Sequence, residues 1–204
     1  MSSNDKGKGI VTAFKVVYNT YDSVQKLMSY LQSSAEEKGD YVCCTDKFLR
    51  WNSDKHIHGW AYNSFILLFQ NEQDGELENE WYDGAVYVFE VDLSGDEHEE
   101  AVVNIARFDY TDIGSWSNAQ PSPSNHWQFN HPLHNVDDMI EYEVDNGLNY
   151  VGKIKTEGKS KTYRGFQRVS GYYVPLMDIT AENAYEVVFG GFDKLRKGTD
   201  SNSK

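Results

Sequence analysis

The sequence has no run of about 18 consecutive apolar residues, so it predicts no transmembrane helix. Its first nine residues are polar and contain no apolar segment followed by small residues, and we therefore expect no signal peptide. Cysteine is scarce: the chain has two, Cys43 and Cys44, adjacent in a predicted strand and so pointing to opposite faces. We expect two reduced thiols, which indicates a reducing compartment, predicted to be the cytoplasm.

Basic side chains are almost missing from the middle of the chain. Between His56 and Gly152, nineteen Asp and Glu accompany a single basic residue, Arg107, which gives this stretch a net charge of −18. Residues 1–55 carry eight Lys and Arg against seven Asp and Glu, and residues 153–204 carry ten against six. So acidic a centre argues against direct binding of nucleic acid, because it would repel the phosphates. It either keeps the surface solvated or offers it to a basic partner.

Common nucleotide and catalytic motifs are absent as well. Neither G-x-G-x-x-G nor G-x-x-x-x-G-K-[ST] occurs, so a nucleotide held by such a loop is not expected. The segment 114–117 (Gly-Ser-Trp-Ser) lacks the second glycine of a nucleophile elbow. An EF-hand calcium loop also fails, because Gly75 at its sixth position would put Gln70 first and Trp81 twelfth.

What is present predicts a single domain over residues 10–197, between disordered tails at 1–9 and 198–204. Residues 10–18 alternate enough to predict a first strand. Apolar residues at i, i+3, i+4 and i+7 from Val24 to Leu31 predict an amphipathic helix over residues 21–37. A late helix is expected at about 181–197, although Gly190 and Gly191 interrupt its pattern.

The segments between these helices favour strands, expected at 41–51, 60–70, 85–93, 101–110, 139–144, 148–155 and 163–174. Residues 65–69 are continuously apolar, which predicts a central strand buried on both faces. Short polar links between the strands at 60–110 favour an antiparallel meander, and Asn146-Gly147 predicts a hairpin. The segment 111–135 is expected to be a long, functional loop. The fold class is therefore α+β, with a largely antiparallel sheet that is curved or closed as a half-barrel.

Histidines fall mainly in two groups. His56 and His58 form an H-x-H pair, whose side chains share one face on a strand, and His126, His131 and His134 lie in the predicted loop. Together they could hold a divalent metal that activates water for hydrolysis. The simpler interpretation is that they are polar loop and strand-end residues, since no H-E-x-x-H motif is present.

The predicted loop also contains Trp116, Trp127 and Phe129. We expect these aromatic side chains to plug the open end of the sheet. A sugar platform or an anchor for a protein partner is the alternative, because aromatic residues are frequent at such sites.

Our leading hypothesis from the sequence is a non-enzymatic acidic protein that binds and inhibits a basic protein partner, with no cofactor and no membrane. An immunity protein, or an anti-defence protein that mimics nucleic-acid charge, fits this pattern. The alternative is a metal-dependent hydrolase with one divalent transition metal, and a third hypothesis is a half-barrel with an aromatic ligand pocket. The carboxylates expected to bind the partner form two clusters, Glu72, Asp74, Glu76, Glu78, Glu80 and Asp83, and then Asp96, Glu97, Glu99 and Glu100.

Overall fold

The computed structural model describes residues 3–96, 98–117, 121–147 and 149–200, and it has the predicted α+β class. A seven-stranded sheet, antiparallel throughout and not closed, has the strand order β1-β2-β3-β4-β7-β6-β5. The strands are β1 (Tyr41–Cys43), β2 (Ser64–Asn71), β3 (Val86–Asp92), β4 (Val102–Tyr110), β5 (Ile140–Asp145), β6 (Asn149–Ile154) and β7 (Phe166–Pro175). The helices are α1 (Ser3–Lys38), α2 (Trp127–Leu133), α3 (Glu157–Thr162) and α4 (Ala184–Asp200).

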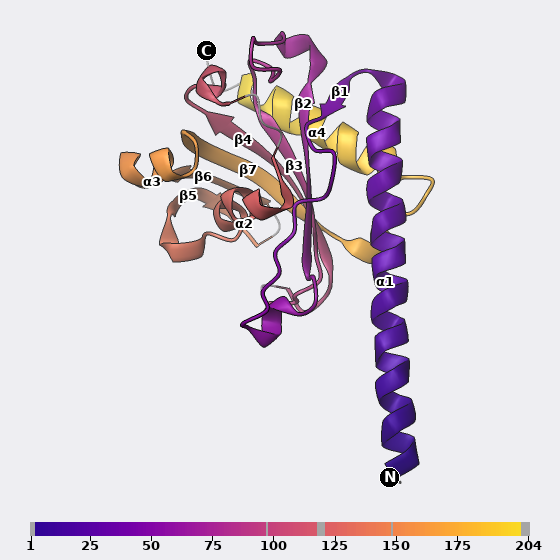
Figure 1. Cartoon of the computed structure of the whole chain (residues 1–204). Coiled ribbons are helices and arrows are strands. Elements are labelled where there is room, and N and C mark those ends of the chain that lie inside the picture. The colour runs from indigo at the N-terminus through magenta and orange to yellow at the C-terminus, as the bar shows by residue number, and fades with distance from the viewer. Residues whose placement is uncertain (1–2, 97, 118–120, 148, 201–204) are drawn as a thin grey trace.

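The central strands are covered on both faces. Helices α1 and α4 pack on one face, and α2 packs on the other (Figure 1). Along β2, Phe65, Leu67 and Phe69 join the core under α1 and α4, whereas Ile66 and Leu68 join the core under α2. The prediction of a strand buried on both faces is therefore confirmed, and so is the antiparallel meander of β2, β3 and β4.

Helix α1 corrects the first predicted strand. Residues 10–18 belong to this helix of 36 residues, and so do residues 3–9 of the predicted N-terminal tail. Over a short window of sequence, apolar and polar residues alternate as they do in a strand. Over a longer window, the apolar residues recur with the spacing of a helix. Its C-terminal half packs on the sheet through Val24, Met28 and Leu31, and its N-terminal half projects beyond the sheet (Figure 1). Within the described chain, no helix has both the length and the apolar character needed to cross a bilayer.

The segment 111–135 was predicted as a loop without regular structure, and this is wrong. It contains two short 3₁₀ helices and α2, which packs on the sheet through Phe129 and Leu133. Trp116 is also buried in this core, and Trp127 packs against it while partly buried. These three aromatic side chains therefore belong to the core under α2 or pack against it.

Several boundaries also differ from the prediction. The strand expected at 41–51 is reduced to β1 and an isolated bridge between Leu49 and Ile66. The β5–β6 hairpin is confirmed, with a positive φ of 78° at Gly147, whereas Leu148 lies outside the described residues. Helix α3 connects β6 to β7. The late helix runs from Ala184 to Asp200, so part of the predicted C-terminal tail is helical, and residues 201–204 lie outside the described residues.

The adjacent cysteines have free thiols, and their side chains pack in different hydrophobic cores, as their predicted opposite orientation requires. Cys43 packs against the core under α1 and α4, and Cys44 is buried in the core under α2. Burial raises the pKa of both thiols, and that of Cys44 lies well above its ordinary value. Both therefore remain protonated at neutral pH.

Candidate functional site

A glutamate is buried in a central strand of the sheet. Glu90 lies in β3, has no exposed surface, and points toward α2. A buried carboxylate destabilises a fold unless hydrogen bonds or an opposite charge compensate it. Glu90 has both, and its partners come from β2 and from the segment around α2.

Three side chains around α2 lie on one helical face. His126 precedes the helix, Asn130 lies within it and His134 follows it, a spacing of i, i+4 and i+8. Asn130 Nδ2 donates to Glu90 Oε1 at 3.1 Å, and His134 Nε2 lies 3.0 Å from Glu90 Oε2. The helix thus places an amide and an imidazole on the two oxygens of the same carboxylate.

Ser64, the first residue of β2, connects His126 to Glu90. Its Oγ donates to Glu90 Oε1 at 2.5 Å and lies 2.8 Å from His126 Nε2. Because the serine gives its only proton to the carboxylate, Nε2 of His126 must carry the proton that it shares with Ser64. Nδ1 of the neutral His126 ring is then an acceptor.

The shifted pKa values of Glu90 and His126 determine which of the two side chains is charged at neutral pH. Burial alone would raise the pKa of Glu90, but the charge of His134 and the hydrogen bonds from His134 and Ser64 outweigh it, so the pKa is lowered. Burial lowers the pKa of His126 from 6.5 to about 4, against the attraction of Glu90. At neutral pH Glu90 is therefore ionised and His126 is neutral.

A hollow of about 520 Å³ opens beside this cluster, and Ser64, His126, Asn130 and His134 line it. Trp51 and Trp127 contribute aromatic surface, and Asp92 and Asp96 contribute carboxylates. Burial raises the pKa of Asp92, which reduces its tendency to ionise. The volume lies within the range of small-molecule sites, roughly 300–1,000 Å³.

Buried polar side chains extend from Glu90 onto the neighbouring strand, β4. Asn104 pairs with Glu90 in the strand register, is fully buried, and accepts a hydrogen bond from the Tyr150 hydroxyl at 2.5 Å. In the described part of the chain, its Nδ2 has no hydrogen-bond partner. An unpaired buried donor costs ~1–3 kcal/mol, so a polar group of this kind in a core calls for an explanation. Function is one such explanation, since strain and perturbed groups gather at sites.

Three of the five predicted metal-binding histidines line this hollow. His126 and His134 contact Ser64 and Glu90, whereas Nδ1 of His131 lies 2.9 Å from the Tyr163 hydroxyl. Among the residues that the structure describes, no group of three His, Cys, Asp or Glu side chains is arranged to hold a metal ion.

The H-x-H pair does not lie on a strand, as its predicted geometry required. His56 is exposed and precedes a 3₁₀ turn, η1 (Ile57–Gly59), which contains His58. The strand geometry that would put both side chains on one face is therefore not present at this pair.

The two predicted acidic clusters lie at opposite ends of the sheet. Residues 72–83 connect β2 to β3 and the cluster at 96–100 connects β3 to β4, so the length of β3 separates them. Most of these carboxylates are exposed, and Glu97 lies outside the described residues. Asp74 instead pairs with Arg196, with Nη2 2.7 Å from Oδ1. The described carboxylates of the two clusters therefore do not share one end of the sheet.

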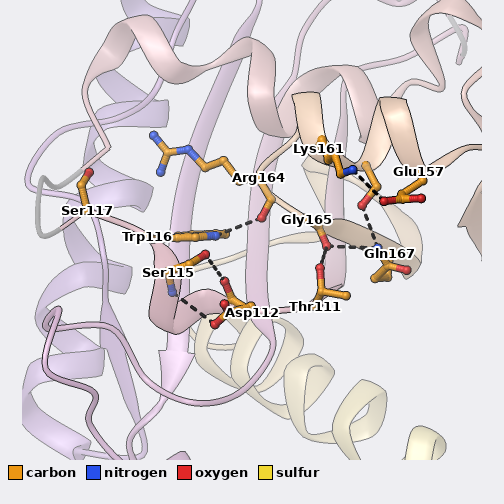
Figure 2. Close-up of a pocket in the computed structure, with 11 residues that line it drawn as sticks. Thr111, Asp112, Ser115, Trp116, Ser117, Glu157, Lys161, Arg164, Gly165 and Gln167 are labelled. Atoms are coloured by element: carbon orange, nitrogen blue, oxygen red, sulfur yellow. Dashed lines mark hydrogen bonds and ion pairs between the residues drawn. The ribbon is translucent and has the colours of Figure 1, made fainter.

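A second hollow, of about 540 Å³, lies between the β4–α2 segment and α3 (Figure 2). The Arg164 guanidinium lies 5.3 Å from the Trp116 ring centroid, and Trp116 Nε1 donates to the Arg164 carbonyl at 3.0 Å. Lys161 is paired with Glu157 at 2.7 Å, which leaves Arg164 as the cation beside the indole. This hollow is lined by Arg164 and an exposed ion pair, whereas the first hollow lies beside a buried carboxylate.

Sequence reasoning missed Glu90, Ser64 and Asn130 as site residues. The spacing of His126, Asn130 and His134 was a detectable signal, because it repeats every four residues, as one face of a helix does. Glu90 gave no such signal, since it lies among exposed carboxylates in the most acidic part of the chain.

Comparison with models of protein families, with curated protein sequences and with solved structures gives no significant match.

Proposed function

We propose that the chain binds a small organic cation, with an ammonium or guanidinium group, in the hollow beside Glu90. The observation that carries this proposal is the buried, ionised Glu90, which engages the polar hydrogens of its neighbours. The hollow is also lined by the carboxylates of Asp92 and Asp96, so a ligand meets acidic groups there in addition to the buried Glu90, whose own charge His134 partly compensates.

The hydrogen-bond inventory supports this choice of ligand. Ser64 and Asn130 each donate to Glu90, and Nε2 of His126 donates to Ser64. These groups retain two acceptors for a ligand, Nδ1 of His126 and Oδ1 of Asn130, beside the second hydrogen of Asn130 Nδ2. A ligand with several N–H donors matches them, whereas an anion would meet lone pairs and carboxylates.

The side chains that line the hollow also favour a cationic ligand. Trp51 and Trp127 line the hollow, and a cation over an indole face gains ~0.5–2 kcal/mol, depending on how fully it is desolvated. Asp92 and Asp96 add nearby negative charge, and Asp96 is exposed, so it would attract a cation to the opening.

Titration with a panel of organic cations tests this proposal. We would follow tryptophan fluorescence and calorimetry with arginine, spermidine, choline and glucosamine, and use glucose as the uncharged counterpart of glucosamine. The double variant Asp92→Asn/Asp96→Asn should weaken binding at least tenfold, about 1.4 kcal/mol. Asp83→Asn, an exposed aspartate at the other end of β3, is the matched control. Absence of saturable binding by every cation, or equal binding of glucose, would refute the proposal.

A different observation favours a second function, inhibition of a basic protein partner by the acidic cluster between β2 and β3. Glu72, Glu76, Glu78, Glu80 and Asp83 are all exposed on this one connection. Closely spaced carboxylates of this kind speed association with a basic partner and make it sensitive to salt. An immunity-type or anti-defence protein would use such a surface against a nuclease or another nucleic-acid-binding protein.

Charge reversal tests the second function. Glu76, Glu78, Glu80 and Asp83 would be changed to Lys, and Asp74 kept because it pairs with Arg196. Binding to a panel of basic nucleases, measured at low and high salt, should be lost while the melting temperature stays near that of the wild type. The control reverses Asp96, Glu99 and Glu100 at the other end of β3. Equal affinity of the wild type and the first variant for every nuclease that binds would contradict the proposal.

A further inference from the structure

The N-terminal half of α1 carries an exposed apolar stripe, which contacts little of the described part of the chain. The exposed fractions of Ile10, Phe14 and Tyr18 are 62%, 62% and 70%, and Val11 and Val17 are also exposed. Tyr21 marks where the sheet begins, because its hydroxyl donates to the Tyr62 carbonyl just before β2. The preceding 18 residues of α1 extend about 27 Å at 1.5 Å per residue.

This stripe continues the one by which α1 packs on the sheet. Positions 10, 14, 17, 21, 24, 28, 31 and 35 alternate steps of four and three residues, and all are apolar. Beyond the sheet, the opposite face carries Lys8, Thr12, Lys15 and Asn19. Such spacing keeps one side of a helix apolar and is typical of helices that pack along another helix.

We propose that the occupant of this stripe is the same helix of a second copy, packed antiparallel about a two-fold axis. Phe14 would lie near the axis, and Ile10 of each chain would face Val17 and Tyr18 of the other. An isologous contact of this kind closes on itself, so the product is a dimer.

Charge sets the orientation. The projecting segment has Lys6, Lys8 and Lys15 against Asp5, whereas the whole chain has a net charge of −13. Parallel helices would bring two acidic bodies side by side. Antiparallel helices place the bodies at opposite ends and bring each basic segment beneath the β3–β4 end of the other copy, where Asp96, Glu99 and Glu100 are exposed.

The area available is that of an ordinary dimer. Ile57 and Trp60 are 69% and 72% exposed, and the segment before β2 that carries them lies at the end of the body from which α1 projects (Figure 1). With the five residues of the stripe they make seven large side chains on each copy. If each loses roughly 100 Å², each chain buries about 700 Å², close to the roughly 800 Å² per partner of a standard interface.

Sedimentation equilibrium on the full chain tests the dimer. The double variant Ile10→Glu/Phe14→Glu should be monomeric and should keep the wild-type melting temperature of the body, because these side chains are exposed. The control Thr12→Glu/Asn19→Glu adds the same charges to the polar face and should stay dimeric. A monomeric wild type up to roughly 100 µM, far above the Kd of a standard interface, would overturn the proposal, as would a dimeric stripe variant.

Two further arms test the orientation and a competing occupant. Gly7→Cys has open space around it and should not form an intermolecular disulfide in an antiparallel pair, whereas a parallel pair would cross-link and overturn the orientation.

Vesicles of phosphatidylcholine and phosphatidylserine serve as the second probe, because a basic amphipathic helix can also lie on a membrane. A monomer that binds these vesicles through Ile10 and Phe14 would replace the second copy with a lipid surface.

Discussion

Stability should fall on mild acidification because His126 cannot take up a proton in the fold. His126 is 5% exposed, and burial lowers its pKa from 6.5 to about 4. The unfolded chain therefore binds this proton as the pH drops below about 6.5, while the folded chain does not until about pH 4. The contribution of neutral His126 is thus complete above this window and is lost within it.

The size of the effect follows from the two pKa values. One pH unit corresponds to about 1.4 kcal/mol, and at about pH 5 the unfolded histidine is almost fully protonated whereas His126 in the fold is mostly neutral. The free energy of unfolding should consequently decrease by about 2 kcal/mol between about pH 7 and pH 5 from this residue alone.

Urea unfolding of the wild type and of His126→Gln over this pH range isolates the effect. Glutamine does not titrate, yet its amide can still donate to Ser64. Burial also lowers the pKa of His131, but that contribution is present in both proteins and cancels in the comparison. The wild type should lose about 2 kcal/mol more than the variant. An equal loss in both proteins would refute the reasoning, because it would show that His126 takes up its proton in the fold.

Three other substitutions test the packing of the fold by chemical denaturation, and the last of them is a control in α3. Glu90→Leu removes the acceptor of His134 and should lower the free energy of unfolding by ~3–5 kcal/mol, so a stability within about 1 kcal/mol of the wild type would contradict the assigned charge. Gly171→Ala would put its Cβ 2.8 Å from the Ile105 carbonyl oxygen and should destabilise by ~1–3 kcal/mol. Gly158→Ala in α3 meets nothing within 4 Å and should be neutral or stabilise by up to about 1 kcal/mol, and a cost as large as that at Gly171 would be inconsistent with this packing.

The sheet was predictable where local pattern and tertiary packing agree. Strands β2, β3 and β4 are strongly apolar or alternating and are joined by polar links, so both their existence and their antiparallel order could be inferred. Residues 10–18 were misassigned because Ile10 to Val17 resemble a strand when they are read without the heptad spacing that continues to Ala35. Helix α2 was hidden by Pro132 and by the polar segment before it, although its apolar residues face the core.

The site was predictable only in part. Grouping His126, His131 and His134 in one segment identified three residues of the hollow, since sequence neighbours on a helix stay close in space. Glu90 could not be distinguished from solvated carboxylates, because its burial depends on α2 crossing β3 from about 40 residues away. The opposite positions of the two acidic clusters do follow from the sequence once β3 is recognised as the strand between them.

The two neighbouring thiols, at the end of β1 and directly after it, can report whether the two layers that cover the sheet open independently of each other. Because Cys43 packs toward α1 and α4 while Cys44 packs toward α2, a single dipeptide samples both hydrophobic cores. The rate at which each thiol reacts with a labelling reagent measures how often its own layer opens. Different rates at Cys43 and Cys44 would mean that the helical layer can separate from the sheet while the layer holding Glu90 stays closed, whereas equal rates would mean that the sheet and both coverings unfold as one unit.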